Sequence, residues 1–165
     1  MNSIYTEISQ RIHGECQELE RVIQRALRAW PYAQKSVSNQ EVYLDSVALN
    51  LHSFYSGLER IFELIARHID HSFPDGETWH RDLLNQMADE IKDIRPAVIG
   101  QNNITSLDEF RRFRHLVRNV YATNLVPDRI SKLMSRLPSL WKSLRAELLA
   151  FADFIDELAK LMDDE

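Results

Sequence analysis

Apolar residues recur every three or four positions along almost the whole chain, the spacing of helices that bury one face. The first such pattern covers residues 4–27, with Pro31 just beyond it and a loop expected at 35–40. A second covers residues 41–69 and contains Gly57. Because glycine costs about 1 kcal/mol relative to alanine inside a helix, this glycine indicates close contact with another helix. No segment alternates apolar and polar residues as a strand does.

A turn separates these two helices from a third. Residues 71–78 hold proline and glycine in turn-forming positions. A helix is then expected over about 78–94. It should end there because the residue before a proline, here Pro96, avoids the helical conformation.

Capping residues and prolines delimit the remaining helices. After a connector at 97–105, the sequence Ser-x-x-Glu at 106–109 is a capping box, which predicts the start of a fourth helix. That helix should end near Asn124. Pro127 suits the first turn of the last helix, and Pro138 is expected to break or kink it.

Five or six helices with short connections predict an all-α fold, an antiparallel helical bundle. With 165 residues, the chain is expected to form a single domain, residues 1–165, around one core. Its single cysteine, Cys16, excludes an intrachain disulfide and a cysteine-rich zinc site, and its helical context predicts burial. An apolar stripe over 141–158 could pack internally or against another subunit.

Charge is distributed unevenly along the chain. Residues 147–165 hold seven acids and one lysine, more than the whole net charge of −5. The C-terminal helix from about 138 is therefore acidic, as a solubilising face or as a surface for a basic partner. The first residues have neither the basic nor the apolar region of a signal peptide, and no run approaches the roughly 18 apolar residues of a membrane span. These features predict a cytoplasmic protein without a membrane partner.

Residues 111–121, Arg-Arg-Phe-Arg-His-Leu-Val-Arg-Asn-Val-Tyr, contrast with this acidity. They place four arginines in one short helical window. Clustered like charges repel each other, so these cations are expected to meet an anion, with phosphate as the first candidate.

Helical geometry places the apolar residues of this window on a buried arc and most of its cations along the border of that arc. The residues of this ridge are Arg111, Arg114, Arg118 and Tyr121. His115 and Asn119 should lie just behind the ridge, and Arg112 on the exposed back of the helix. At such a border the charged groups are partly desolvated, which strengthens their attraction for an anion. Alternatively, the ridge pairs with acids of a neighbouring helix, such as the last one.

The histidines outside this window give weaker signals. No helix shows the His-x-x-x-His spacing of a zinc pair, and no P-loop, Rossmann glycine pattern or nucleophile elbow is present. We therefore expect neither a metal site nor a cofactor. At the start of the third helix, Trp79 is predicted to be a core anchor and His80 a hydrogen-bonded residue at the border of the core.

Arg114-x4-Asn119-x-Tyr121 resembles the Arg-x4-His-x-Tyr signature of HEPN-fold toxins of the HepT type. Other segments agree in the same order along residues 40–135. They are Tyr55-x-x-Leu58-Glu59, Pro74-x-Gly76-x-x-Trp79-His80-x-x-Leu83-Leu84, Arg95-Pro96 and Phe113-Arg114-His115-x-x-Arg118-x-x-Tyr121-x-x-x-Leu125. The order of these segments along an all-helical chain makes the resemblance specific.

This resemblance implies a small helical bundle that forms a homodimer, with two motif helices over a shared cleft. It implies a metal-independent endoribonuclease that acts on RNA as the toxin of a toxin–antitoxin pair. The antitoxin would be a minimal nucleotidyltransferase, which in some members adenylylates the motif tyrosine, here Tyr121.

The chain departs from the family signature at one position, because Asn119 stands where the signature has a histidine. The residues expected to act in catalysis are Arg114, His115, Arg118, Asn119 and Tyr121. Those expected to bind RNA are Arg111, Arg112 and His80. Either His115 takes over the proton transfer, or the protein is catalytically degenerate and binds RNA or a nucleotidyltransferase without cleaving. A third possibility is a helical dimer whose arginines only pair with its own carboxylates.

Overall fold

The computed structural model describes residues 3–35, 38–119 and 127–165. Within these residues the chain forms helices and no strand, so the predicted all-α fold is confirmed. The helices are α1 (Ile4–Lys35), α2 (Gln40–His68), α3 (Trp79–Gln86), α4 (Gln101–Asn119) and α5 (Pro127–Asp163). None of them is long and apolar enough to cross a membrane.

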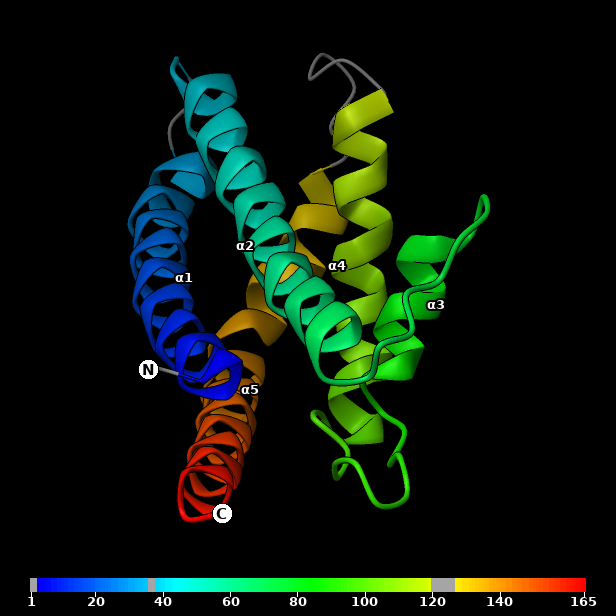
Figure 1. Cartoon of the computed structure of the whole chain (residues 1–165). Helices are drawn as coiled ribbons and strands as arrows, with labels where there is room; N and C mark the ends of the chain where they lie inside the picture. Colours follow the sequence, from blue (N-terminus) through cyan, green and yellow to red (C-terminus); the bar gives the residue numbers. More distant parts are fainter. Residues whose placement is uncertain (1–2, 36–37, 120–126) are drawn as a thin grey trace.

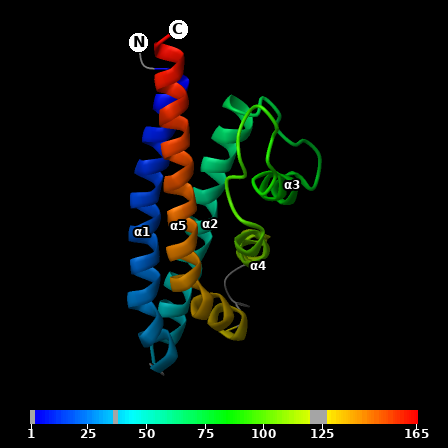
Figure 2. The same ribbon diagram turned by 90° about the horizontal axis from the view of Figure 1, so that it is seen from below.

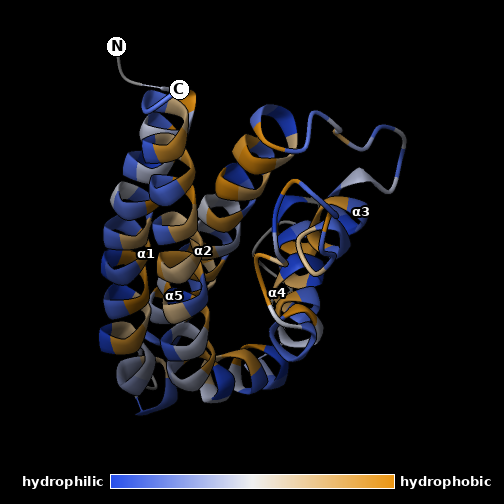
Figure 3. Ribbon diagram, turned by 60° about the horizontal axis from the view of Figure 1, so that its bottom comes forward, coloured by the Kyte–Doolittle hydropathy of each residue, from blue (hydrophilic) through white to orange (hydrophobic). Residues whose placement is uncertain are grey.

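The long helix α1 runs antiparallel to α2 and α5, which run in the same direction as each other (Figures 1 and 2). The helices α3 and α4 pack beyond α2. The start of α1 and the end of α5 lie at the same end of the bundle. Figure 3 shows hydrophilic and hydrophobic residues around each long helix, in keeping with the amphipathic pattern of the sequence. Because α2 contacts each of the other four helices, its side chains reach both parts of the bundle.

The core is one continuous cluster of apolar side chains from all five helices. At its centre Phe54 of α2 makes edge contacts with Phe110 of α4, at 5.4 Å between ring centroids, and with Trp141 of α5, at 6.1 Å. Cys16 is buried as expected. A Cβ atom on Gly57 would lie 2.7 Å from Cδ2 of Leu19, which confirms that this glycine permits the close approach of α1 and α2.

The first helix continues beyond its predicted end. The sequence pattern stops at residue 27, before Pro31, whereas α1 extends through this proline to Lys35. The additional turns still have a buried face, because Ala33 is in the core and Tyr32 stacks on Tyr43 of α2 at 5.0 Å. Tertiary packing therefore offsets the backbone hydrogen bond that proline removes.

The third helix is shorter than predicted, because α3 ends at Gln86 rather than near residue 94. The guanidinium of Arg95 is fully buried and donates hydrogen bonds to the backbone carbonyls of Gln86 and Asp89 at 3.2 and 2.8 Å. It also pairs with the buried carboxylate of Asp70, at 2.5 Å for the closest atoms. A distant side chain thus satisfies carbonyls at the end of α3, where the next helical turn would otherwise be needed.

The fourth helix begins earlier than predicted. The capping box at 106–109 does not start it, and the expected connector at 97–105 is wrong in its second half, because α4 begins at Gln101. The reason lies in α5, where Glu147 accepts hydrogen bonds from the backbone N–H of Gly100 and from the side chain of Asn103. A carboxylate at a helix N-terminus satisfies an unpaired N–H and favours the helix dipole.

The last helix begins at Pro127, as predicted, and runs through Pro138 without interruption. Figure 2 shows that its axis bends between the mustard-coloured first part and the orange part that follows. Pro138 therefore kinks this helix and does not break it, because the missing N–H and the ring are tolerated at a bend. The predicted end of the fourth helix near Asn124 lies outside the described residues.

Candidate functional site

A cavity of about 240 Å³ lies between the start of α3 and the middle of α4. Its lining residues are Glu77, Thr78, His80, Arg81, Arg111, Arg114 and His115. A larger hollow of about 470 Å³ lies between α1 and α5, but its lining is more apolar than polar and includes no histidine. The smaller cavity is the one that gathers arginines and histidines from two helices, so it is the candidate site.

Arg114 is fixed in this cavity by α2. Its Nε atom donates a hydrogen bond to the hydroxyl of Ser56 at 2.8 Å, and its Nη2 atom lies 3.7 Å from Oε1 of Glu59. The side chain is only 15% exposed, so it occupies the border of the core, as the helical geometry predicts. A partly buried and oriented guanidinium attracts an anion more strongly than one in open solvent.

Glu59 is the buried residue that joins two of the predicted site residues. Its Oε2 atom lies 2.7 Å from Nδ1 of His80, and its other oxygen faces Arg114. The carboxylate is almost fully buried, so it depends on these partners. Glu59 is not among the site residues predicted from the sequence. The available signal was an acid one turn after Tyr55 and one turn before Phe62, both on the buried stripe of α2.

His80 is a hydrogen-bonded residue at the border of the core, as predicted. Its ring stacks on that of Trp79, at 3.5 Å between centroids and 29° between planes. Trp79 in turn contacts Phe73 at 5.5 Å and packs against the core. The ring of His80 is therefore held at one nitrogen by Glu59 and at one face by an indole.

Arg111 and Arg112 share a single carboxylate. Their Nε atoms lie 2.8 and 2.9 Å from the two oxygens of Asp108, one turn earlier on α4. Arg112 stands on the exposed back of the helix, as predicted, with 63% of its side chain exposed. Since one acid serves two arginines, this pair retains a positive charge.

The acids of the last helix form no ion pair with the ridge in the described part of the chain, so that form of the pairing alternative is wrong. Partial pairing comes instead from Glu59 of α2 and Asp108 of α4. In the ion pair between α4 and α5, the base comes from α5 and the acid from α4: Arg136 of α5 lies 2.7 Å from the carboxylate of Glu109 of α4.

His52 of α2 is a neighbour of the ridge that the sequence analysis missed. Its pKa is lowered, first by burial and then by the positive charges of Arg114 and Arg118. The histidine therefore tends to remain neutral beside these cations. Arg118 itself is exposed and does not line the cavity.

Tyr55 lies beneath the site with its hydroxyl buried. Its pKa is raised, first by burial and then by the negative charge of Glu59. Among the described residues this hydroxyl has no hydrogen-bond partner. The charges of Arg111, Asp108 and Arg114 also affect the pKa of this hydroxyl. A buried polar group therefore lies close to the charged residues of α4.

The family model described as HepT-like protein matches residues 46–155, two thirds of the chain. The chain belongs to the HepT-like family. No curated protein and no solved structure matches it. The matched residues span α2 to α5 and include every residue that lines the α3–α4 cavity.

Two positions of the HepT-like signature cannot be placed in the cavity. Asn119 is the last residue of α4, and its side chain lies outside the described part of the structure. Tyr121 lies entirely outside the described residues. The cavity therefore brings together Arg114 and His115 of the expected catalytic residues, and Arg111 and His80 of the expected RNA-binding residues.

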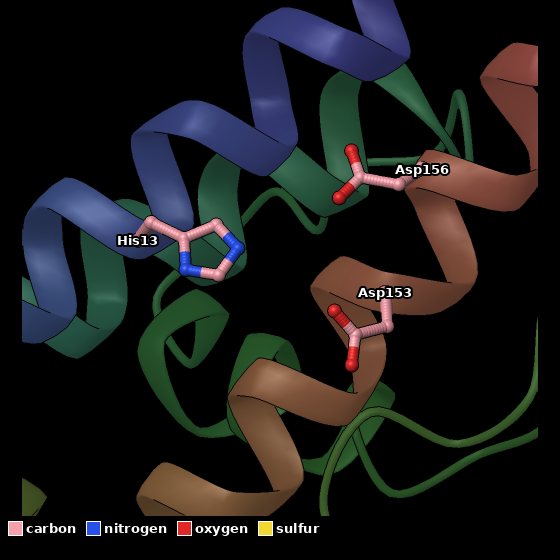
Figure 4. A group of neighbouring side chains, drawn as sticks. All are labelled: His13, Asp153 and Asp156. Atoms are coloured by element: carbon pink, nitrogen blue, oxygen red, sulfur yellow. The ribbon is translucent and has the colours of Figure 1, made fainter.

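A separate group of side chains that could hold a metal ion lies between α1 and α5 (Figure 4). One ligand atom each from His13, Asp153 and Asp156 lies within 4.8 Å of the others. His13 and Asp153 are exposed. Ligand spacing within one helix gives no sign of this group, because its members come from two helices near opposite ends of the chain. These helices contribute no residue to the α3–α4 cavity.

Proposed function

We propose that this HepT-like protein is the toxin of a HEPN/nucleotidyltransferase toxin–antitoxin pair and acts as a metal-independent endoribonuclease. It would work in the cytoplasm as a homodimer, with a minimal nucleotidyltransferase as antitoxin. The observation that carries the proposal is the α3–α4 cavity, where three arginines and two histidines meet and α2 fixes Arg114.

The charges of the site suit a phosphodiester. Cleavage of RNA without a metal ion needs cations at the phosphate, where negative charge develops, and a group that accepts the proton of the 2′-hydroxyl. Arg114 is partly buried and oriented, so it is the first candidate for the phosphate oxygens, with exposed Arg118 as the second. Arg111 and Arg112 would hold the RNA backbone on either side.

The remaining signature residues have roles that the resemblance supplies. Tyr121 would be the residue that the nucleotidyltransferase modifies. Asn119 would contact substrate through its amide, because a carboxamide does not titrate in the physiological range.

Asn119 also supports the alternative function, a catalytically degenerate HEPN protein that binds RNA or a nucleotidyltransferase without cleaving. The two functions share the arginines and differ in turnover. A protein that only binds should show a steep loss of RNA affinity with salt and no products.

The test is cleavage of a labelled RNA by the purified protein in buffer with a chelator. Arg114→Ala should lower the rate by about 100-fold or more, the usual cost of removing one such charge-stabilising group. Arg21→Ala is the matched control, because Arg21 is exposed on α1 and, among the residues that the structure describes, forms its ion pair with nearby Glu18. Salt-dependent RNA binding without products would establish the alternative, and unchanged cleavage by Arg114→Ala would refute the proposed site.

A further inference from the structure

We propose that His80, held by the buried carboxylate of Glu59, accepts the 2′-hydroxyl proton in this cleavage, and that His115 protonates the leaving group. This inference rests on the proposed function. His80 replaces the proton acceptor that Asn119 cannot be. It comes from α3, whereas the residues of the family signature lie on or after α4.

The contact between Glu59 and His80 sets the state of the imidazole. A carboxylate can only accept a hydrogen bond, so Nδ1 of His80 is the donor across the 2.7 Å contact. In the neutral ring Nε2 then carries the free lone pair. When the ring gains a proton, the adjacent carboxylate stabilises the resulting charge, as in other carboxylate–histidine pairs of hydrolytic enzymes.

Two contacts and the burial of Glu59 fix this pair in one geometry. The ring of His80 stacks on Trp79, Glu59 is buried, and the second oxygen of Glu59 faces Nη2 of Arg114 at 3.7 Å. The same carboxylate therefore orients the proton acceptor and the phosphate-binding arginine relative to each other. Such a link holds reacting groups at a constant separation, which is what efficient proton transfer requires.

His80 is nevertheless accessible to a substrate. It lines the α3–α4 cavity together with Arg111 and Arg114, and 24% of its side chain is exposed. His115 lines the same cavity from α4. Two histidines on different helices can thus contact two different oxygens of one bound phosphodiester.

The proposed step is balanced as follows. Nε2 of His80 takes the proton of the 2′-hydroxyl, and the 2′-oxygen forms a bond to phosphorus. The bond from phosphorus to the 5′-oxygen breaks, its electron pair stays on that oxygen, and His115 supplies the proton. The products are a 2′,3′-cyclic phosphate and a free 5′-hydroxyl, and both histidines return to their starting states by exchange with water.

The experiment compares an RNA oligonucleotide with the same oligonucleotide carrying sulfur in place of the bridging 5′-oxygen at the cleavage site. Sulfur leaves without protonation, so it removes the need for an acid and not the need for a base. His80→Ala should lower kcat by about 10²- to 10⁴-fold on both substrates. His115→Ala should be comparably slow on the oxygen substrate and close to wild type on the sulfur substrate. His68→Ala, at an exposed position at the end of α2, is the control and should match wild type.

Glu59 is a positioning residue in this scheme, so it needs a separate readout. Glu59→Gln keeps the volume and an oxygen that accepts from Nδ1, but it lacks the charge that stabilises protonated His80. We expect kcat to fall by about ten-fold or more with KM little changed, and the pH profile of kcat to shift. An unchanged pH profile in a folded Glu59→Gln protein would contradict the pairing.

The outcomes separate this inference from the proposed function. Cleavage that survives His80→Ala would overturn the role of His80 and leave the nuclease function intact. Rescue of His80→Ala by the sulfur substrate would reverse the two roles and also overturn it. Failure of the wild-type protein to cleave either substrate while still binding RNA would refute the nuclease function, and the role of His80 with it.

Discussion

The carboxylate of Glu147 on α5 accepts a hydrogen bond from the backbone N–H of Gly100, the residue directly before α4. The same side chain accepts from Asn103 in the first turn of that helix. Since α4 carries Arg111, Arg114 and His115, this contact connects the acidic C-terminal helix to the position of the candidate site. From the sequence alone, Glu147 belongs to an acidic face that would serve solubility. In the structure it is hydrogen-bonded to the start of α4.

We expect Glu147→Ala to destabilise the protein by about 1 kcal/mol, the usual cost of losing a helix cap. Urea unfolding followed by circular dichroism measures the change. Glu157→Ala is the matched control on the same helix, because in the described part of the chain Glu157 forms an ion pair with Lys160 alone, and that pair is exposed. Equal stability of the two variants would show that the cap does not hold α4.

The buried ion pair of Asp70 and Arg95 gives a second prediction. Asp70→Asn leaves the Arg95 guanidinium, which is fully buried, without its counter-charge, and should cost about 3–5 kcal/mol of unfolding free energy. Thermal and urea unfolding should both show the loss. Asp75→Asn, at an exposed position in the following loop, should change the unfolding free energy little.

Tyr55 gives a prediction of the opposite sign. Its hydroxyl is buried without a hydrogen-bond partner among the described residues, which costs free energy. Tyr55→Phe should therefore leave the unfolding free energy unchanged or raise it by about 1 kcal/mol. A loss of more than about 1 kcal/mol in urea unfolding would mean that the hydroxyl has a partner, such as a buried water.

His52 predicts a dependence of stability on pH. Its pKa is lowered in the folded protein by burial and by Arg114 and Arg118, so the unfolded chain binds this proton more readily. The stability contribution of neutral His52 is complete above the ordinary pKa of 6.5 and is lost as pH falls through the folded value.

The measurement compares wild type with His52→Gln between pH 7.5 and pH 5. The stability of wild type relative to the variant should decline as the pH is lowered, because only wild type has this proton-binding group. A difference that stays constant over this range would show that neither burial nor the two arginines lowers the pKa of His52 in the folded protein.

Much of the fold could be predicted from the sequence, because the pattern that makes a helix is local. The three- and four-residue spacing of apolar side chains gave the extent of α2 within one residue at each end, and Pro127 gave the start of α5. The same periodicity placed Arg114 at the border of the core and Arg112 on the exposed back, because a residue's direction around a helix follows from its position alone.

The ends of α3 and α4 could not be predicted, because helix termini depend on which groups satisfy the last backbone carbonyls and the first N–H groups. Arg95 donates a hydrogen bond to a carbonyl at the end of α3, and Glu147 accepts one from the N–H directly before α4. Both residues lie outside these two helices. The local capping box at 106–109 offered a plausible start that a side chain of α5 overrides.

The amino-acid sequence by itself determined the helices, the cluster of arginines on α4 and the membership of the HepT-like family. The tertiary structure alone decided that Glu59 would contact both His80 and Arg114, and that His52 would face the ridge. These residues come from different helices, and a helical pattern fixes only the direction of a side chain around its own axis. Which side chains meet depends on how the helices pack, and that follows from the shape of the common core.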